Sequence, residues 1–377
     1  MRIAATLIGL TAPAFTTLSG ARLTPVLATI MALVSAPCFS AAETDGKSWA
    51  IGVHFENDLF ADTDSQYTNG IKITAVSPDL NSLFKQRDDL PTWLRALLPL
   101  EHLPFETHEK VTRTFAFSLG QNMYTPNDTT QRALIANDRP YAGWLYLGAT
   151  FQTRSEDQQD TFDAQFGVIG PYSFAQESQE QIHRLRGFSV PQGWNNQLRS
   201  EPAVVLAYER TWRHRLGGRM RAGPAVDLLT RAGGAIGNVA VYASSAAQVR
   251  AGWNLPLDFG YSVIRPGGVS QISTLPQANN RGDTSDQHAL LRTPRWSAYA
   301  FLGAEGRMIG RDIFLHGNTW RDSHSVDHKP FVADLMAGVT MSLVGLKISL
   351  ARVLRTREFR GQSVNHRFGS ITVSYAF

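Results

Sequence analysis

The sequence is poor in cysteine. Its one cysteine, Cys38, lies in the first 42 residues. We interpret residues 1–42 as a secretory signal, because an apolar stretch at Val26–Val34 is followed by small residues at Ser40–Ala42 that suit cleavage. Residues 43–377, the expected mature chain, therefore have neither a disulfide nor a thiol nucleophile.

The sequence is also low in charge and lacks a long apolar run. Charged residues make up 18% of the 377 residues, which argues against a cytosolic α/β enzyme. No apolar run after residue 42 approaches the roughly 18 residues that a membrane-spanning helix needs, so a helical membrane protein is excluded. A secreted, cysteine-free chain without such a helix points to the envelope of a Gram-negative cell.

Several enzyme motifs are absent from the sequence: the G-x-S-x-G nucleophile elbow, the H-E-x-x-H zinc helix and the G-x-x-x-x-G-K-[ST] phosphate loop. Of the 36 basic residues, six are lysine and the rest arginine. Arginine suits bidentate contact with phosphate, although codon bias explains its excess equally well. We expect no nucleic-acid partner.

What recurs after residue 42 is alternation of apolar and polar residues in segments of about ten, the signature of membrane β-strands. In Arg367–Phe377, for example, Ile371, Val373 and Tyr375 alternate with small polar residues. The pattern predicts an all-β fold, a transmembrane antiparallel β-barrel of about twelve strands that occupies residues 43–377. The predicted strands are 48–57, 67–77, 111–121, 143–153, 160–169, 200–212, 218–230, 238–250, 295–306, 330–342, 345–354 and 366–377.

The connections between these strands differ in length. Residues 78–110 are expected to form a helical insertion, and residues 251–294 have room for a further pair of strands. The turns at 154–159 and 213–217 are short, as inner-side turns should be. If both termini lie on the periplasmic side, the polar segments at the ends of the first three strands and the 170–199 segment all lie at the outer rim.

Hard oxygen donors gather at this predicted rim. Asn57 and Asp58 end the first strand, and Thr68 begins the second. Such ligands suit calcium. A local Asx-turn network, in which the side chains satisfy nearby backbone groups, explains the same spacing.

Other polar rim residues are candidates for catalysis or substrate contact. His183 lies in a segment whose glutamine and glutamate content predicts a short helix in an extracellular loop. A neutral histidine there can act as a general base, although a loop histidine is more often a bystander. Arg132 and Arg139 either meet anionic sugar phosphates or pair with loop carboxylates, and Tyr124, at the end of the third strand, is a third candidate substrate contact.

Five segments, in this order, carry a family resemblance. They resemble the outer-membrane lipid A 3′-O-deacylase family over most of the mature chain. The resemblance implies a twelve-stranded barrel, a site between the barrel wall and a loop helix, and calcium-dependent hydrolysis of an ester in lipid A, the membrane anchor of lipopolysaccharide. The segments are FENDLF (55–60), QYTNG (66–70), QNMYTP (121–126), NDRPYAGWLY (137–146) and GVIGPYSFAQESQEQIHRLRG (167–187).

The resemblance also implies roles for individual residues. His183 matches the histidine that activates water, and Arg132 matches a basic loop position. Two positions depart from the better-known members, which have a lysine at Gln131 and a glutamate at Ser189. Glu177 or Glu180 is a candidate to replace that carboxylate. The residues that match the polar positions around the calcium site are Asn57, Asp58 and Thr68.

Three other functions fit the sequence. One is a non-enzymatic outer-membrane barrel, such as a porin or an envelope-stability protein. Another is an outer-membrane phospholipase with a serine nucleophile. The third is a folded but inactive member of the deacylase family, since Gln131 and Ser189 depart from its pattern. The sequence predicts no oligomeric state.

Overall fold

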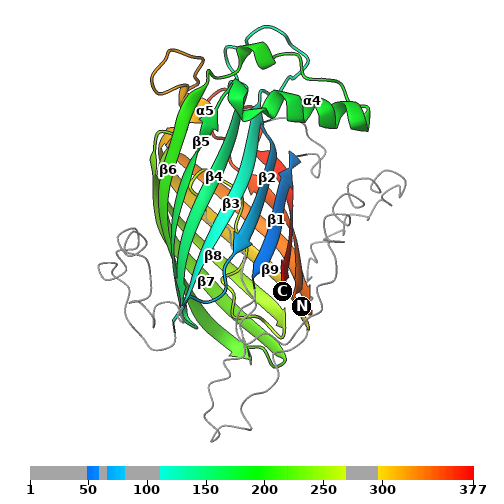
Figure 1. Ribbon diagram of the computed structural model, residues 1–377, viewed down its shortest axis with the longest axis vertical. Coiled ribbons are helices and arrows are strands. Elements are labelled where there is room, and N and C mark those ends of the chain that lie inside the picture. The colour runs from blue at the N-terminus through cyan, green and yellow to red at the C-terminus, as the bar shows by residue number, and fades with distance from the viewer. Residues whose placement is uncertain (1–48, 59–65, 81–110, 219, 269–295) are drawn as a thin grey trace, which may run out of the picture. The chain divides into compact units, whose positions relative to one another are not determined.

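The computed structural model describes residues 49–58, 66–80, 111–218, 220–268 and 296–377. The strands form one closed barrel in which sequence neighbours pair antiparallel and β1 pairs with β12 (Figure 1). The strands are β1 (Ala50–Asn57), β2 (Gln66–Val76), β3 (Thr112–Thr125), β4 (Ala142–Arg154), β5 (Gln158–Ile169), β6 (Glu201–Gly218), β7 (Pro224–Gly237), β8 (Ala240–Trp253), β9 (Trp296–Asp312), β10 (Phe331–Leu343), β11 (Leu346–Arg355) and β12 (His366–Ala376).

The helices of the described residues are short. None of them is long and apolar enough to cross a membrane. The predicted signal, residues 81–110 of the predicted insertion and residues 269–294 of the predicted extra strand pair lie outside the described residues. The helices are η3 (Pro171–Ser173), α4 (Ala175–Arg186), η4 (Trp194–Asn196) and α5 (Ile313–His316).

The predicted fold class is confirmed, because all twelve predicted strands are present and the barrel is closed. One predicted turn was wrong: β6 continues to Gly218, so residues 213–217 are strand rather than turn. Arg213, the first residue of the predicted turn, points into the lumen. There its Nε lies 3.3 Å from a carboxylate oxygen of Asp227. The charge of Arg213 is therefore paired with a carboxylate inside the barrel and is not exposed to water at a turn.

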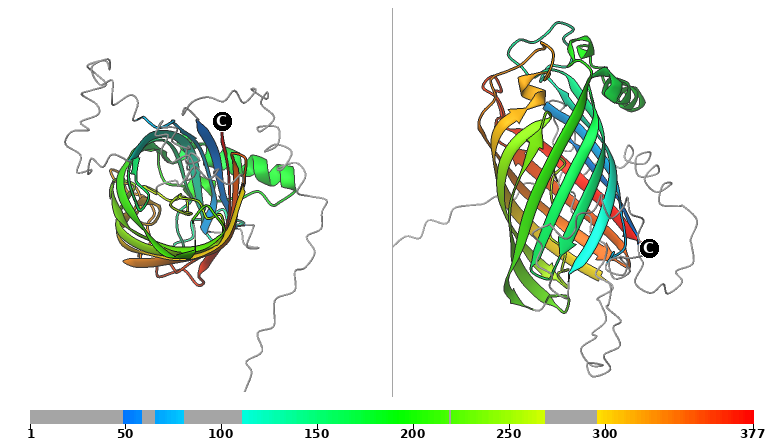
Figure 2. Two further views of the ribbon diagram at one scale, coloured as in Figure 1. Left: turned by 90° about the horizontal axis from the view of Figure 1, so that it is seen from below. Right: turned by 60° about the vertical axis from the view of Figure 1, so that its left-hand side comes forward.

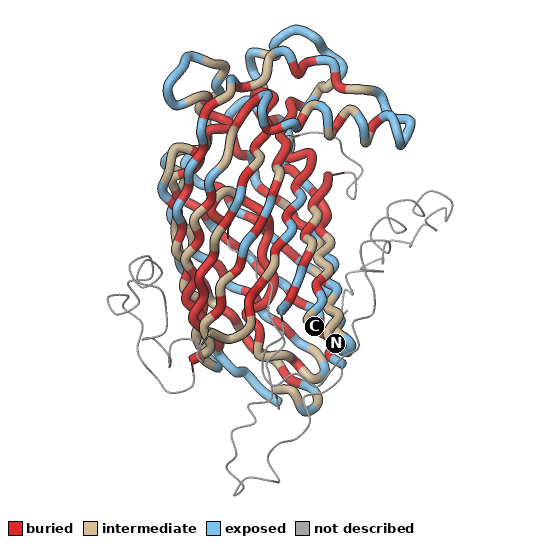
Figure 3. Tube along the Cα trace, in the orientation of Figure 1, coloured by how far each residue is buried: buried red, intermediate tan, exposed pale blue. Residues whose placement is uncertain are grey.

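The two faces of the wall differ as the alternation requires. Buried and exposed positions alternate along each strand (Figure 3). Large apolar side chains stand on the outward face, with Phe117 62%, Leu147 65% and Met341 65% exposed. Such a band is costly in water and favourable against lipid chains. The outward face is therefore built to contact a bilayer.

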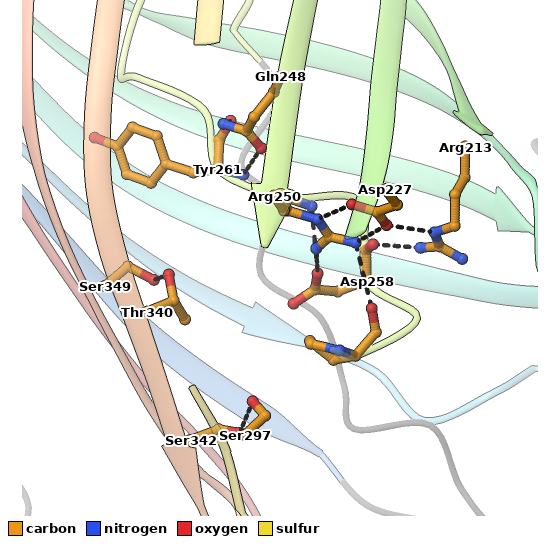
Figure 4. A network of polar contacts seen from close by, with 12 residues as sticks. Arg213, Asp227, Gln248, Arg250, Asp258, Tyr261, Ser297, Thr340, Ser342 and Ser349 are labelled. Carbon is orange, nitrogen blue, oxygen red and sulfur yellow. Dashed lines mark hydrogen bonds and ion pairs between the residues drawn. The ribbon is translucent and has the colours of Figure 1, made fainter. Parts of the chain in front are cut away.

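The inner half of the lumen is held together by ion pairs (Figure 4). The Arg250 guanidinium donates to both carboxylate oxygens of Asp227, at 2.9 and 2.6 Å, and also to Asp258. Lys347 reaches the other oxygen of Asp258 at 2.5 Å. Asp258 belongs to the connection between β8 and β9. This connection therefore enters the barrel instead of lying beneath it.

The described part of this connection, residues 254–268, runs inside the ring of strands (Figure 2, left). We call it the lumen segment. Tyr261 N–H donates to Gln248 Oε1 at 3.1 Å, and Ile264 N–H donates to Glu56 Oε1 at 2.9 Å. Farther along, Gly267 N–H donates to Gln165 Oε1 at 3.1 Å. These bonds connect the segment to strands around the barrel, including the inner face of β1 next to Asn57.

Removing the central cation of the lumen tests this arrangement. We expect Arg250→Leu to lower the free energy of unfolding by about 3–5 kcal/mol, because Asp227 and Asp258 would stay buried without their shared guanidinium. Urea unfolding of the folded barrel in detergent micelles, followed by tryptophan fluorescence, measures this. The control is Arg360→Leu, since Arg360 and Asp327 are 3.9 Å apart with side chains 80% exposed, and such pairs contribute about 0–1 kcal/mol. Equal losses in the two variants would contradict the account.

Candidate functional site

Polar side chains interrupt the apolar outward face at the outer ends of β1 and β2. Asn57 pairs in register with Asn69 on one side and with Gly369 on the other. Because Glu56 points into the lumen, the next residue, Asn57, points outward. Both asparagines are buried, so something covers them on the outside of the wall.

A β-bulge in β2 adds the hydroxyl of a third residue, Thr68, at the ends of β1 and β2. The register of β2 against β3 shifts between Tyr67 and Asn69, which leaves Thr68 as the extra residue. Its hydroxyl lies 2.7 Å from the hydroxyl of Thr125, the last residue of β3. Asp58, which follows Asn57, is fully buried. The structure thus confirms that the polar ends of β1 and β2 meet, and it adds Asn69, which the sequence analysis had not selected.

Helix α4 lies on the outer side of the wall. The left-handed backbone of Phe174 (φ 56°) turns the chain from η3 into α4. The helix contacts β4 and β3 and lies outside the ring of strands when seen along the barrel (Figure 2, left). The predicted extracellular loop helix is therefore present. It lies beside the wall and not over the barrel mouth.

Close packing against β3 and β4 holds the first turn of α4 in place. Gly143 of β4 has no side chain, and a Cβ there would overlap with Ser173 Oγ and Ala175 Cβ. Gln121, an outward residue of β3, donates from Nε2 to the backbone oxygen of Ser173 at 2.6 Å. Beside it, Ala175 joins a buried apolar cluster with Met123, Tyr141 and Trp194.

The buried side of α4 consists of Ala175, Gln179 and His183, spaced four residues apart. Gln179 Oε1 accepts from Trp194 Nε1 at 2.8 Å. His183 Nδ1 lies 2.7 Å from the backbone oxygen of Ser189. A carbonyl oxygen only accepts, so Nδ1 carries the proton. The neutral ring then has its lone pair on Nε2, as a general base requires.

The two glutamates of α4 do not share this buried side. Glu180 accepts from Gln176 at 2.8 Å and from Arg184 at 2.7 Å, and Glu177 is exposed. Ser189 contributes its backbone oxygen to His183. The structure therefore places no carboxylate of Glu177 or Glu180 beside His183.

Arg132 and Gln131 lie in the loop between β3 and β4. Arg132 is exposed, and its Nε donates to Gln192 Oε1 at 3.2 Å. Gln131 Nε2 donates to Asp128 at 2.9 Å. The hydroxyl of Thr130 and this amide lower the pKa of Asp128 below its usual value. Arg132 thus points to solvent above the rim, while Gln131 stabilises the loop itself.

Tyr124 and Arg139 lie on the other side of the wall. Tyr124 stacks on Phe314 of α5 with ring centroids 4.0 Å apart. The Arg139 guanidinium lies 5.0 Å from the Tyr124 ring centroid and 3.5 Å from Glu358. Burial alone raises the pKa of Glu358, but the charges of Arg139 and Arg355 outweigh it and hold that pKa below its usual value. The structure therefore does not bring these two candidates together with His183.

The oxygen donors on the outward face fit a hard cation. They are the amides of Asn57 and Asn69 and the hydroxyl of Thr68, and the buried carboxylate of Asp58 follows Asn57 directly in the chain. Asn69 Oδ1 is buried and has no hydrogen-bond partner among the described residues. In that part of the chain, no group of three or more His, Cys, Asp or Glu side chains is arranged to hold a metal ion. Any ion here would rest on amide and hydroxyl oxygens together with Asp58, a set that calcium accepts.

Comparison with known proteins decides the family. The family model for "Outer membrane protein LpxR" matches residues 26–377. The chain belongs to the LpxR family. This confirms the resemblance and the localisation: the LpxR-family chain is an outer-membrane protein.

Solved structures were also compared with this LpxR-family chain, and the first of them shares its fold. LpxR from Salmonella typhimurium is 18% identical with a TM-score of 0.64, and the match covers 88% of this chain and 100% of that chain. The β domain of the Bordetella autotransporter BrkA is 8% identical with a TM-score of 0.37, over 89% of this chain and 99% of its own. A comparison with curated proteins gave no match.

Filling the space at Gly143 tests the seat of α4. We expect Gly143→Ala to displace the helix, because the new methyl group overlaps with Ser173 and Ala175, while the barrel stays folded. Trypsin should then cut faster after Arg184 and Arg186, as judged by mass spectrometry of the fragments. In Gly306→Ala the methyl group meets no atom within 4 Å, so cleavage should match the wild type. Unchanged cleavage in Gly143→Ala would show that α4 is not seated there.

Proposed function

We propose that this LpxR-family protein is a lipid A 3′-O-deacylase, which hydrolyses the ester of an acyloxyacyl chain with calcium and a histidine-activated water. The observation that carries the proposal is His183. Its Nδ1 is fixed by the Ser189 carbonyl, and its side chain lies on the buried face of α4. The nearby ends of β1 and β2 carry the buried Asn69 oxygen, which has no hydrogen-bond partner among the described residues. An ordinary lipid-facing wall needs none of these features.

The location suits a substrate that is itself part of the membrane. Lipid A holds its acyl chains in the bilayer and its phosphates at the surface. A site on the outward face, between the wall and α4, meets the chain where it leaves the bilayer. The substrate then reaches His183 without entering the lumen.

The residues of this chain supply the proton transfers. His183 Nε2 takes a proton from a water whose oxygen attacks the ester carbonyl carbon. As the bond between this carbon and the sugar oxygen breaks, the imidazolium returns the proton to the sugar oxygen. A fatty acid and a free hydroxyl result. The Ser189 carbonyl keeps the ring oriented and stabilises the positive charge on it.

Calcium fits the donor set at the ends of β1 and β2. Asn57, Asp58 and Thr68 would hold it, with Asn69 as a fourth residue whose buried oxygen has no hydrogen-bond partner in the part of the chain that the structure describes. When bound, the ion supplies positive charge for the oxyanion that forms on the ester carbonyl. In this proposal Arg132 contacts the substrate. The expectation from sequence that Tyr124 and Arg139 also do so is not part of it, because their contacts lie on the inner side of the wall.

The lumen segment bears on the main alternative, a porin. A conducting pore needs a continuous water path, whereas residues 254–268 run through the lumen and are bonded to Gln248, Glu56 and Gln165. These bonds favour the enzyme over the channel.

Loss of the base is the direct test of the proposal. We expect cells that express the wild type to contain lipid A lighter by one acyloxyacyl chain, and His183→Ala to reduce this product by about 10²–10⁴-fold. Mass spectrometry of extracted lipid A measures the change. His214→Ala is the control, because that histidine is exposed and bonds Thr230. Unmodified lipid A in wild-type cells that carry the folded barrel would instead indicate an inactive or non-enzymatic protein.

Calcium dependence has its own test. We expect a chelator to abolish deacylation by the purified protein and added calcium to restore it. Asp58→Asn should weaken calcium binding by at least tenfold, because the proposed calcium ligands lose their one carboxylate. Titration calorimetry with calcium alone measures binding independently of activity. Asp128→Asn, which changes a partly exposed carboxylate in the β3–β4 loop, should bind calcium as the wild type does. Full activity in the chelator would remove calcium from the account.

A further inference from the structure

Helix α4 begins at the outer edge of the apolar outward face of the wall. Gln121 of β3 donates to the backbone oxygen of Ser173, directly before the helix. Leu119 lies two residues from Gln121 on the same face of β3, and it is exposed like the other lipid-facing residues of the wall. Two residues of a strand span about 7 Å. The first turn of α4 therefore lies where the acyl chains of a bilayer meet its headgroups.

The surface of α4 differs on the two edges of its buried side. A helix turns about 100° per residue, so Ile182 and Leu185 lie together on one edge, which we call the apolar flank. Three residues spaced four apart lie on the opposite edge and form the polar flank: Gln176, Glu180 and Arg184. The buried side, which contacts the protein, separates the two flanks.

The polar flank is suited to water. Glu180 accepts from Gln176 at 2.8 Å and from Arg184 at 2.7 Å, and Arg184 is exposed. This network stays satisfied with water around it, because each charged group has both a protein partner and access to solvent.

The apolar flank and the two ends of the helix are not suited to water. Leu185 is 87% exposed, and Phe174, at the start of the helix, is 56% exposed. Phe188, just after the helix, is exposed as well, and the Arg186 guanidinium lies 4.9 Å from its ring centroid. Large apolar side chains exposed together on one helix are costly in water and mark an interaction surface.

The chemistry and the depth of this surface both favour lipid as its partner. The apolar flank continues the apolar outward face, which already contacts a bilayer. Aromatic rings and arginines are typical of the boundary between acyl chains and headgroups. There the rings of Phe174 and Phe188 can reach the acyl chains while the charge of Arg186 stays among anionic headgroups.

We propose that α4 is an interfacial helix that inserts its apolar flank, with Phe174 and Phe188, into the outer lipid leaflet. Its polar flank faces the surrounding water. The partner is the lipid surface itself, so the proposal goes beyond the proposed function and holds whether or not the protein is an enzyme. It also states what sets the depth of His183, because that residue lies on the buried side between the two flanks.

A label on either flank tests the insertion. Residues 43–377 contain no cysteine, so Leu185→Cys and its neighbour on the polar flank, Arg184→Cys, are each made together with Cys38→Ser and coupled to an environment-sensitive fluorophore. The folded full-length protein is reconstituted in nanodiscs of equal parts phosphatidylcholine and phosphatidylglycerol, whose two faces are both open to solution. We expect nitroxide-labelled acyl chains to quench the label of Leu185→Cys, while aqueous iodide loses most of its effect on it. The label of Arg184→Cys should show the reverse.

Phe174→Cys repeats the comparison at the other end of the helix and should behave as Leu185→Cys does. Heat-modifiable migration on gels checks that each variant contains the folded barrel. Two outcomes would overturn the proposal. Equal iodide quenching on both flanks would place α4 in water above the leaflet. Protection of the Leu185→Cys label from both quenchers would show that a protein, such as a second copy of the chain, covers the apolar flank instead.

Discussion

The structure depends on one constraint: a wall that faces lipid must present apolar side chains, and every polar group on it needs a cover or a partner. Most of the described wall obeys, with residues such as Leu147 and Met341 on the outside. The outer ends of β1 and β2 do not, since Asn57, Thr68 and Asn69 stand on the same face. Helix α4 lies outside the ring against the neighbouring strands β4 and β3, and its buried side carries His183.

The inward-facing residues of β1 are held by contacts inside the barrel. Glu56, next to Asn57, points inward and accepts from the Ile264 N–H of the lumen segment at 2.9 Å. His54 lies 3.2 Å from the same carboxylate oxygen. The end of β1 is therefore held from within while its outer face carries the candidate site. A filled lumen gives a rigid support for a site built on the wall, which an open pore would not.

Much of this arrangement was predictable from sequence. Period-two alternation yielded all twelve strands, and strand parity put the polar ends and α4 at one rim. The same alternation, continued to the end of β3, places Met123 and Tyr124 on opposite faces of the wall. It therefore indicates that Tyr124 faces the lumen. The bulge at Thr68 could not be foreseen, because one extra residue changes the face of its neighbour without changing composition. The lumen segment has no periodicity, and its ion pairs join residues far apart in the chain, such as Asp258 and Lys347.

The central claim is that the site lies on the outward face of the wall, beneath α4. A crystal structure with calcium and a lipid A analogue whose scissile ester is replaced by an ether tests it most directly. The account predicts an anomalous calcium signal at Asn57, Asp58 and Thr68, with the ether beside His183 Nε2. Calcium and the analogue bound inside the barrel mouth, at Tyr124 and Arg139, would contradict it.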